Sequence, residues 1–151
     1  MEHVTWQDYK PIGVLIVNAT LDTSYHTSGS TMALIDSQQP ISTSGLGHPA
    51  DADLDKYNQL LLYVKVALGS ATDMRMIIDF SPDNEQNWYQ ETSESISGGT
   101  ATMTQLEHVF SASGNYIIAI PIKYPRARIR NKVTGTATGN TCTVTGAVGV
   151  Q

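Results

Sequence analysis

The stretch Tyr57-Asn-Gln-Leu-Leu-Leu-Tyr-Val-Lys-Val-Ala-Leu68 decides the fold class. Its even positions from residue 60 to residue 68 are all aliphatic, whereas its odd positions include Gln59, Tyr63 and Lys65. Successive side chains of a β-strand point to opposite sides, so apolar residues at every second position predict a strand with one buried face.

The chain on both sides of this stretch continues the β pattern. Met74, Met76, Ile78 and Phe80 predict a second strand after a turn at 69–72. Short strands about 10 residues apart, without helical periodicity, predict an all-β fold, an antiparallel β-sandwich of jelly-roll type with about eight strands. The remaining strands are expected at 13–20, around 88–89, 101–110, 115–122, 126–138 and 141–148, with Gly139-Asn140 as a two-residue hairpin turn. The predicted core is Leu60, Leu62, Val64, Val66, Met76, Ile78, Phe80, Val144 and Val148.

The domain organisation is expected to be simple. Residues 1–12 are predicted to form an extended N-terminal arm, and residues 13–151 a single β-sandwich domain. Residues 21–56 are rich in Ser, Thr, Gly, Pro and Asp, with one short apolar run at 31–35. A loop-rich segment of this length is typical of a binding or interface region.

The composition fits a globular β protein. Of the 151 residues 40% are hydrophobic and only 15% are charged, against about 25% charged in typical domains. The chain has no apolar run long enough to span a bilayer and no signal-peptide pattern at Met1, which favours synthesis in the cytoplasm. The single cysteine, Cys142, lies on the same face of its predicted strand as Val144 and is expected to be a buried hydrophobic residue.

The charge is unevenly distributed. The net charge of −5 argues against general nucleic-acid binding. Every acidic residue precedes His108, whereas a basic row follows it at alternate positions of one predicted strand: Arg126, Arg128, Arg130 and Lys132. Like charges along one strand face repel each other unless acids oppose them. The acids must come from the N-terminal part of this chain or from another chain, and the sequence leaves both alternatives open.

No motif indicates catalysis or a cofactor. The four histidines are far apart, and Gly45–Ala50 fits a dinucleotide motif without the strand and helix that the motif requires. Asp51, Asp53 and Asp55 are a weak calcium candidate, because Lys56 and Leu62 stand where an EF-hand needs Gly and Glu. The sequence therefore predicts a non-enzymatic protein without a cofactor or a metal.

Two apolar groups are candidate binding residues. Trp88 and Tyr89, with Trp6, suit stacking on a sugar, although neighbours on a strand point opposite ways and one of the adjacent pair is expected in the core. The run from Tyr116 to Ile122, which includes Ile118, is apolar on both faces. One face of a sandwich strand normally meets water, so a loop or a partner is expected to cover this one.

Two blocks carry a resemblance to a known class of proteins. They are Phe80-Ser-Pro-Asp-Asn-Glu-Gln-Asn-Trp-Tyr-Gln90 and Arg126-Ala-Arg-Ile-Arg-Asn-Lys-Val-Thr-Gly-Thr-Ala-Thr-Gly-Asn-Thr-Cys-Thr-Val-Thr145. With the strands between them, they resemble small β-sandwich virion proteins of tailed bacteriophages. The resemblance covers residues 57–151, and it departs from the pattern at Pro82 and Glu85, where such proteins often have Asn or Gly.

The resemblance implies a structural role in a virion and no catalytic residues. The expected function is that of a capsid decoration protein, with a neck, tail or baseplate component and a carbohydrate-recognition module for host attachment as alternatives. The expected partners are copies of the chain and other virion proteins such as the major capsid protein, with no nucleic acid and no membrane. The basic row, Tyr116, Ile118 and Trp6 are the expected contacts. The rival class is an enzyme acting on surface polysaccharide.

Overall fold

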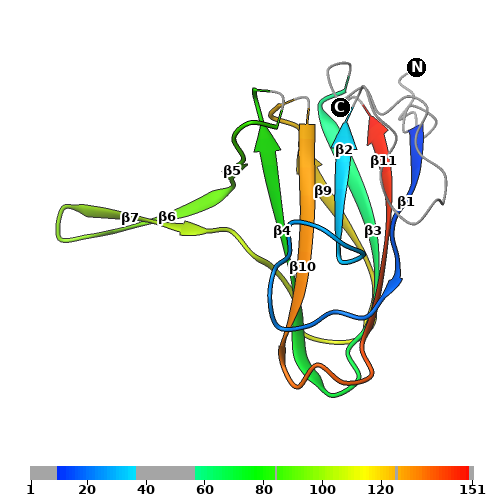
Figure 1. The fold of residues 1–151 in the computed structure, drawn as a ribbon. Helices are drawn as coiled ribbons and strands as arrows, with labels where there is room; N and C mark the ends of the chain where they lie inside the picture. Colours follow the sequence, from blue (N-terminus) through cyan, green and yellow to red (C-terminus); the bar gives the residue numbers. More distant parts are fainter. Residues whose placement is uncertain (1–9, 37–56, 84, 125, 150–151) are drawn as a thin grey trace, which may run out of the picture.

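The computed structural model describes residues 10–36, 57–83, 85–124 and 126–149, which form antiparallel β-sheets and contain no helix. Figure 1 shows two sheets packed face to face, an arrangement consistent with a β-sandwich. The all-β prediction is therefore confirmed. One sheet, named sheet A, has the order β1-β11-β3-β9, and its strands are β1 (Lys10–Ala19), β11 (Thr141–Gly149), β3 (Gln59–Ala67) and β9 (Gly114–Pro121).

The opposing sheet, named sheet B, is centred on β10 and β4. Its order is β2-β10-β4-β5, and β8 also pairs with β4. Its strands are β2 (Met32–Asp36), β10 (Arg126–Gly135), β4 (Ala71–Ser81), β5 (Tyr89–Gln90) and β8 (His108–Phe110). Between β5 and β8 the chain forms a separate hairpin that extends away from the sandwich in Figure 1, made of β6 (Thr92–Ser97) and β7 (Thr100–Gln105).

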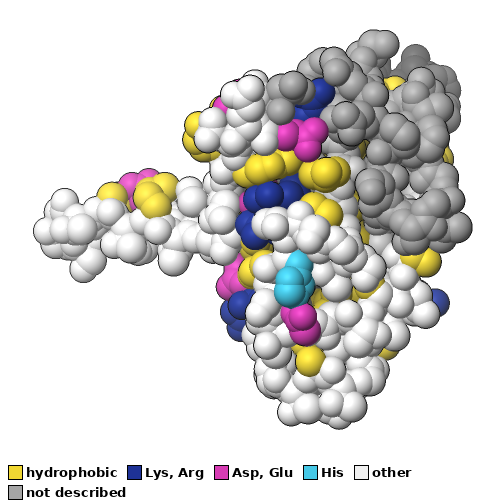
Figure 2. All heavy atoms as spheres, in the orientation of Figure 1, with side chains coloured by type: hydrophobic (Ala, Val, Ile, Leu, Met, Phe, Trp, Pro, Cys, Tyr) yellow, Lys and Arg dark blue, Asp and Glu magenta, His cyan; other side chains and the backbone are white. Residues whose placement is uncertain are grey.

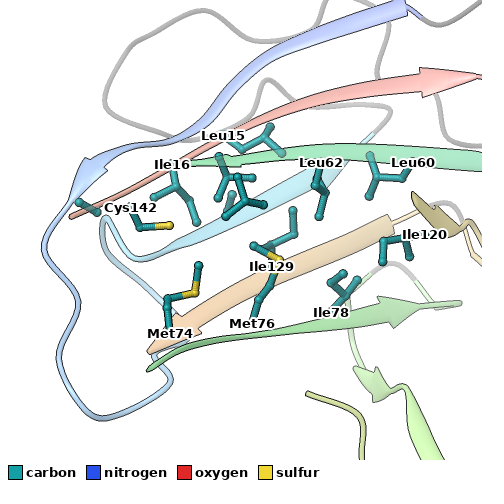
Figure 3. Close-up of a cluster of buried hydrophobic side chains, with 14 of the residues drawn as sticks. Leu15, Ile16, Leu60, Leu62, Met74, Met76, Ile78, Ile120, Ile129 and Cys142 are labelled. Atoms are coloured by element: carbon teal, nitrogen blue, oxygen red, sulfur yellow. The ribbon is translucent and has the colours of Figure 1, made fainter. Parts of the chain in front are cut away.

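The core lies between the two sheets, as the alternation predicted. Every residue of the predicted core is at most 4% exposed. Figure 3 shows Leu60 and Leu62 of β3 pointing toward Met76 and Ile78 of β4, with Ile129 of β10 among them. The burial of these branched and thioether side chains supplies the main stabilising free energy of the fold.

Two strand boundaries differ from the sequence prediction. β1 begins at Lys10, so the last residues of the predicted arm belong to sheet A. The strand expected at 101–110 is divided into β7 and β8, because the Leu106 amide donates to the Glu91 carbonyl oxygen (2.8 Å) where the hairpin returns to the sandwich. β2 is the apolar run within the loop-rich segment.

The predicted two-residue turn at Gly139-Asn140 is wrong. β10 ends at Gly135 and β11 begins at Thr141, so the connection is longer. Asn140 is buried and serves another purpose: its Oδ1 accepts from the Leu21 amide (2.8 Å) and its Nδ2 donates to the Leu21 carbonyl oxygen (3.0 Å). These bonds satisfy the backbone amide and carbonyl groups of Leu21, which follows β1. The residue types around Asn140 give no indication of this distant contact.

Candidate functional site

The predicted basic row lies on the outer face of sheet B, in its central strand β10. Arg126 and Arg130 are buried, and Arg128 and Lys132 are half-buried. Figure 2 shows Lys and Arg side chains gathered on this face, with acidic and hydrophobic side chains around them. The row is therefore mostly covered and is not an open strip of charge.

Acids from the N-terminal part of the chain oppose the row. Asp79 on the neighbouring strand β4 is completely buried, and its Oδ2 accepts from Arg128 Nη2 (2.8 Å) and from Arg130 Nε (2.9 Å). A Glu85 carboxylate oxygen lies 3.6 Å from Arg126 Nε. Of the two alternatives that the sequence leaves open, intramolecular pairing is the one found among the described residues. Whether the row also contacts a partner stays a prediction.

A second charged cluster lies beside the row and binds the β1–β2 loop to sheet B. The Tyr25 hydroxyl of that loop donates to Glu107 Oε2 (2.7 Å), and Arg75 Nη1 donates to Glu107 Oε1 (3.1 Å). Arg75 also donates to Asp73 through Nε (3.1 Å) and Nη2 (3.2 Å). The Tyr25 ring lies 4.8 Å from the Lys132 ammonium, within the range of a cation–π contact.

These contacts shift the pKa values of the cluster. The hydrogen bond from Tyr25 is the largest cause that lowers the pKa of Glu107, and the hydrogen bonds from Arg75 lower the pKa of Asp73. Burial, followed by the hydrogen bond to Glu107, raises the pKa of the Tyr25 hydroxyl. The carboxylates are thus held in their charged form, and the phenol is held protonated as their donor.

The lowered pKa values predict that the protein loses stability in acid. In the unfolded chain Asp and Glu titrate near about 3.9 and 4.3, above their values in the folded protein. The stabilisation is therefore complete above about pH 4.5 and is lost as the pH falls through the folded values, because the unfolded state then binds more protons. Unfolding free energies measured in urea between pH 6 and pH 3 should show this loss.

The Glu107→Gln variant should lose less stability than wild type over that interval, since it has one fewer linked carboxylate. Glu94→Gln on the β6–β7 hairpin removes the same charge outside the cluster and should keep the wild-type slope. If Glu107→Gln and wild type lose unfolding free energy equally as the pH falls, the cluster does not contribute to the loss of stability in acid.

Neither member of the Trp88-Tyr89 pair enters the core, so that prediction is wrong. Trp88 is half-buried against the outer face of sheet B, and the Arg128 guanidinium lies 4.6 Å from the centre of its ring. Tyr89 is 55% exposed. Trp88 precedes β5, which has only two residues and lies at the edge of sheet B, so the strict alternation of a long strand does not apply to this pair.

A polar hollow lies where the β6–β7 hairpin leaves the sandwich. Its lining includes Tyr89, Tyr124, Glu91 and Lys123. Both tyrosines are exposed, and Lys123 Nζ lies 3.7 Å from Glu91 Oε2. Glu91 Oε1 is buried and has no hydrogen-bond partner among the described atoms. Two exposed phenol rings beside a carboxylate can stack on a sugar and accept hydrogen bonds from it.

Strand β9 lies at an edge of sheet A and has two unlike faces. Its inner residues Tyr116, Ile118 and Ile120 pack on the core, and the Tyr116 hydroxyl donates to the Ala112 carbonyl oxygen (2.6 Å). On its outer face Ile117 is 69% exposed and lies opposite Tyr63 of β3, which is 41% exposed. These two belong to a shallow hollow on the outer face of sheet A, called the sheet A hollow below, whose lining also includes Lys65, Asn115, Thr143 and Thr145.

Among the described strands, the β6–β7 hairpin belongs to neither sheet of the sandwich. Every residue of β6 and β7 is exposed except Gln105, and each strand pairs only with the other. Gly98 and Gly99, both at positive φ (55° and 79°), form its two-residue turn. One face holds only hydroxyl side chains, whereas the other holds Glu94, Ile96, Ala101 and Met103. Ile96 is 72% and Met103 is 58% exposed.

Sequence reasoning missed this hairpin, although a signal was present. Ser-x-Ser-x-Ser97 and Thr100-x-Thr-x-Thr104 alternate on each side of Gly98-Gly99. Two alternating runs around a Gly-Gly pair are a standard hairpin pattern. Because the alternating residues carry hydroxyl side chains and not aliphatic ones, the pattern indicates strands in which neither face packs on a core.

The remaining candidate residues do not form a binding site within the described part of the chain. Cys142 is buried, as expected, and burial raises the pKa of its thiol to about 12. In the described part of the chain, no group of three His, Cys, Asp or Glu residues is placed to hold a metal ion, and no helix is long and apolar enough to cross a membrane. Trp6 and the acidic candidates Asp51, Asp53 and Asp55 lie outside the described residues.

Comparison with known proteins adds no family. No protein-family model matches the sequence, and no curated protein matches it. The function therefore has to be argued from the surfaces described above.

Proposed function

We propose that this chain is a non-enzymatic structural protein of a virion, made in the host cytoplasm, that binds the assembled capsid as a decoration protein and stabilises it. Its partners are copies of itself and the major capsid protein. The observation that carries the proposal is the β6–β7 hairpin, which is exposed along its length with Ile96 and Met103 uncovered. An isolated two-stranded hairpin is only marginally stable in water, so such an element suits a chain that works against neighbours.

The proposal includes a jelly-roll topology for the sandwich. Strands β1, β3, β9 and β11 form one sheet, and β2, β4, β8 and β10 lie in the other, so the chain alternates between sheets for its first four strands and again from β8 to β11. This order supports two interleaved Greek keys, an architecture used by viral capsid and lectin domains. Because a fold does not define a function, the topology supports the virion role only in combination with the surfaces.

The charged residues of sheet B also favour a structural role. Asp79, Asp73 and Glu107 are each engaged with arginines of the same face. A catalytic carboxylate needs access to a substrate, whereas Asp79 is completely buried. The hairpin and the sheet A hollow remain exposed, and both suit protein contacts.

The experiment is to remove the hairpin and measure assembly. Residues 92–105 are replaced by Asn-Gly, which joins Glu91 to Leu106, two residues already linked by a backbone hydrogen bond. The variant should unfold at the wild-type urea concentration, because the hairpin packs on none of the core, yet it should lose saturable binding to capsids that lack the protein. Wild-type binding by the shortened chain would overturn the proposal. Binding of the intact chain to tails or baseplates, and not to shells, would place it as a neck, tail or baseplate component.

The polar hollow beside Tyr89 favours a second candidate function, a carbohydrate-recognition module for host attachment. Tyr89 and Tyr124 line the hollow together with the charged residues Glu91 and Lys123. Trp88 suits stacking less well, since Arg128 already occupies one face of its ring. A glycan array that responds to wild type and to Tyr63→Ala, but not to Tyr89→Ala with Tyr124→Ala, would put this function first. Turnover of a glycan by the purified chain would instead support the rival enzyme class.

A further inference from the structure

The apolar face of the β6–β7 hairpin is not covered by any other described segment of the chain. This face is formed by Glu94, Ile96, Ala101 and Met103, and Glu94 is the only charged residue between positions 92 and 105. In Figure 2 hydrophobic and acidic side chains lie together along the projecting hairpin. Exposed apolar side chains of this size beside a single charge are typical of a contact surface.

The sheet A hollow has matching chemistry. Its exposed apolar residues are Tyr63 and Ile117, and its threonines offer hydroxyls at the rim. Lys65 is the only charged residue of its lining, and it lies two positions from Tyr63 on the same face of β3. The hollow therefore repeats the pattern of the hairpin with the sign of the charge reversed, which favours this pairing over others.

The widths of the two surfaces also agree. Two paired strands are about 5 Å apart. The hollow extends across β9, β3 and β11, three strands that together are about 10 Å from first to last. The hairpin is thus narrow enough to lie within the hollow.

The hairpin does not cover the sheet A hollow of its own molecule, since Ile96, Met103, Tyr63 and Ile117 are all exposed. The hairpin is inserted between β5 and β8, which both pair with β4 of sheet B, whereas the hollow is on the outer face of sheet A. Figure 1 shows the hairpin extending away from both sheets. A hairpin directed this way does not fold back onto its own sheet A, so the matching hollow must belong to another molecule.

We infer that the β6–β7 hairpin of one copy docks in the sheet A hollow of a second copy, with Ile96 and Met103 against Tyr63 and Ile117, and Glu94 beside Lys65. This inference rests on the proposed structural function and names the surfaces that serve it. The contact joins two unlike patches, so it is heterologous: repetition closes into a ring when the rotation allows, and otherwise continues as an open chain.

The test uses two complementary variants of the full chain and measures self-association by sedimentation velocity. Ile96→Asp impairs the hairpin and leaves the hollow intact, whereas Ile117→Asp impairs the hollow and leaves the hairpin intact. Each variant alone should associate at least about tenfold more weakly than wild type, because a buried apolar contact is replaced by an unpaired charge. A mixture of the two should form a one-to-one complex and no larger species. The intact hairpin of Ile117→Asp then docks in the intact hollow of Ile96→Asp, and the remaining hairpin and hollow are both impaired.

A charge exchange tests the orientation. Glu94→Lys and Lys65→Glu should each weaken association, and the double variant that carries both should recover most of it, because the opposite charges are restored in exchanged positions. Thr102→Ala on the hydroxyl face of the hairpin is the matched control and should associate like wild type. All of these positions are exposed, and circular dichroism should confirm that each variant folds.

The outcomes separate this inference from the proposed function. If the mixture of Ile96→Asp and Ile117→Asp stays monomeric, or if both variants associate like wild type, the docking model is wrong even if the chain decorates capsids. If the wild-type chain stays monomeric at high concentration, the docking model fails. If that monomer also does not bind capsids, the proposed function is wrong as well.

Discussion

Replacement of Asp79 by Ala should lower the free energy of unfolding by about 3–5 kcal/mol, the usual cost when one partner of a buried ion pair is removed. Asp79 is completely buried, and its Oδ2 accepts hydrogen bonds from both Arg128 and Arg130. Without this carboxylate the two guanidinium groups remain under the Trp88 and Tyr25 rings without their counter-charge. Urea unfolding followed by tryptophan fluorescence measures the loss.

Two further variants identify the cause of that loss. Asp79→Asn keeps the size and one acceptor oxygen, so it should lose less stability than Asp79→Ala. Asp79→Leu combined with Arg128→Met and Arg130→Met removes all three charges and should recover much of the stability, because buried ion pairs are replaceable by apolar groups of similar volume. If Asp79→Ala costs less than about 1 kcal/mol, the pairing does not stabilise the fold.

The same contacts change how the basic row should be tested. For an exposed basic row, reversal of Arg128 and Arg130 to Glu would weaken attachment and leave the fold intact. In the structure such carboxylates would stand beside the buried Asp79 carboxylate. We therefore expect the reversal to unfold the protein, and attachment is better tested on the hairpin.

Replacement of Gly69 by Ala should lower the free energy of unfolding by about 2–4 kcal/mol. Gly69 lies in the β3–β4 turn at φ +59°, a conformation that costs an L-residue about 1–2 kcal/mol. A Cβ added there would lie 2.4 Å from the Thr138 carbonyl oxygen and from the Gly139 carbonyl carbon. These are backbone atoms, and the Ser70 amide donates to the same Thr138 oxygen (2.8 Å), so the turns cannot separate without losing that bond.

Gly139→Ala is the matched control. Gly139 lies in the facing turn at φ +74°, but a Cβ there would meet nothing closer than 3.8 Å. It should therefore show only the conformational cost of about 1–2 kcal/mol. Equal losses of unfolding free energy in the two variants would show that the close approach of the turns has no energetic role.

The pattern of apolar residues was sufficient to predict the core. Alternation in β3 and β4 identified Leu60, Leu62, Met76, Ile78 and Phe80 as buried, and all of them are. The physical reason is local: a strand directs alternate side chains to alternate sides, so the residue order alone separates the core face from the outer face. The same reasoning correctly predicted that Cys142 is buried.

Relations between distant strands could not be predicted in the same way. The acid that opposes Arg128 and Arg130 is Asp79, about 50 positions earlier, and only the antiparallel register of β4 and β10 places it beside them. Asn140 binds Leu21 across a longer separation of 119 positions. Such contacts depend on which strands become neighbours, a choice that the period of a single strand does not contain.

The exposed surfaces depend on tertiary structure for the same reason. The sequence shows that Ile117 is apolar, but only the tertiary structure places it beside Tyr63 on an outer sheet face that no described segment covers. The residues of the β6–β7 hairpin have strand-forming composition, yet only the pairing of β5 and β8 with β4 directs the hairpin away from both sheets. Side-chain chemistry along this chain thus determined what each strand would bury, whereas the packing of strands distant in sequence decided which charges are paired and which apolar faces remain for a partner.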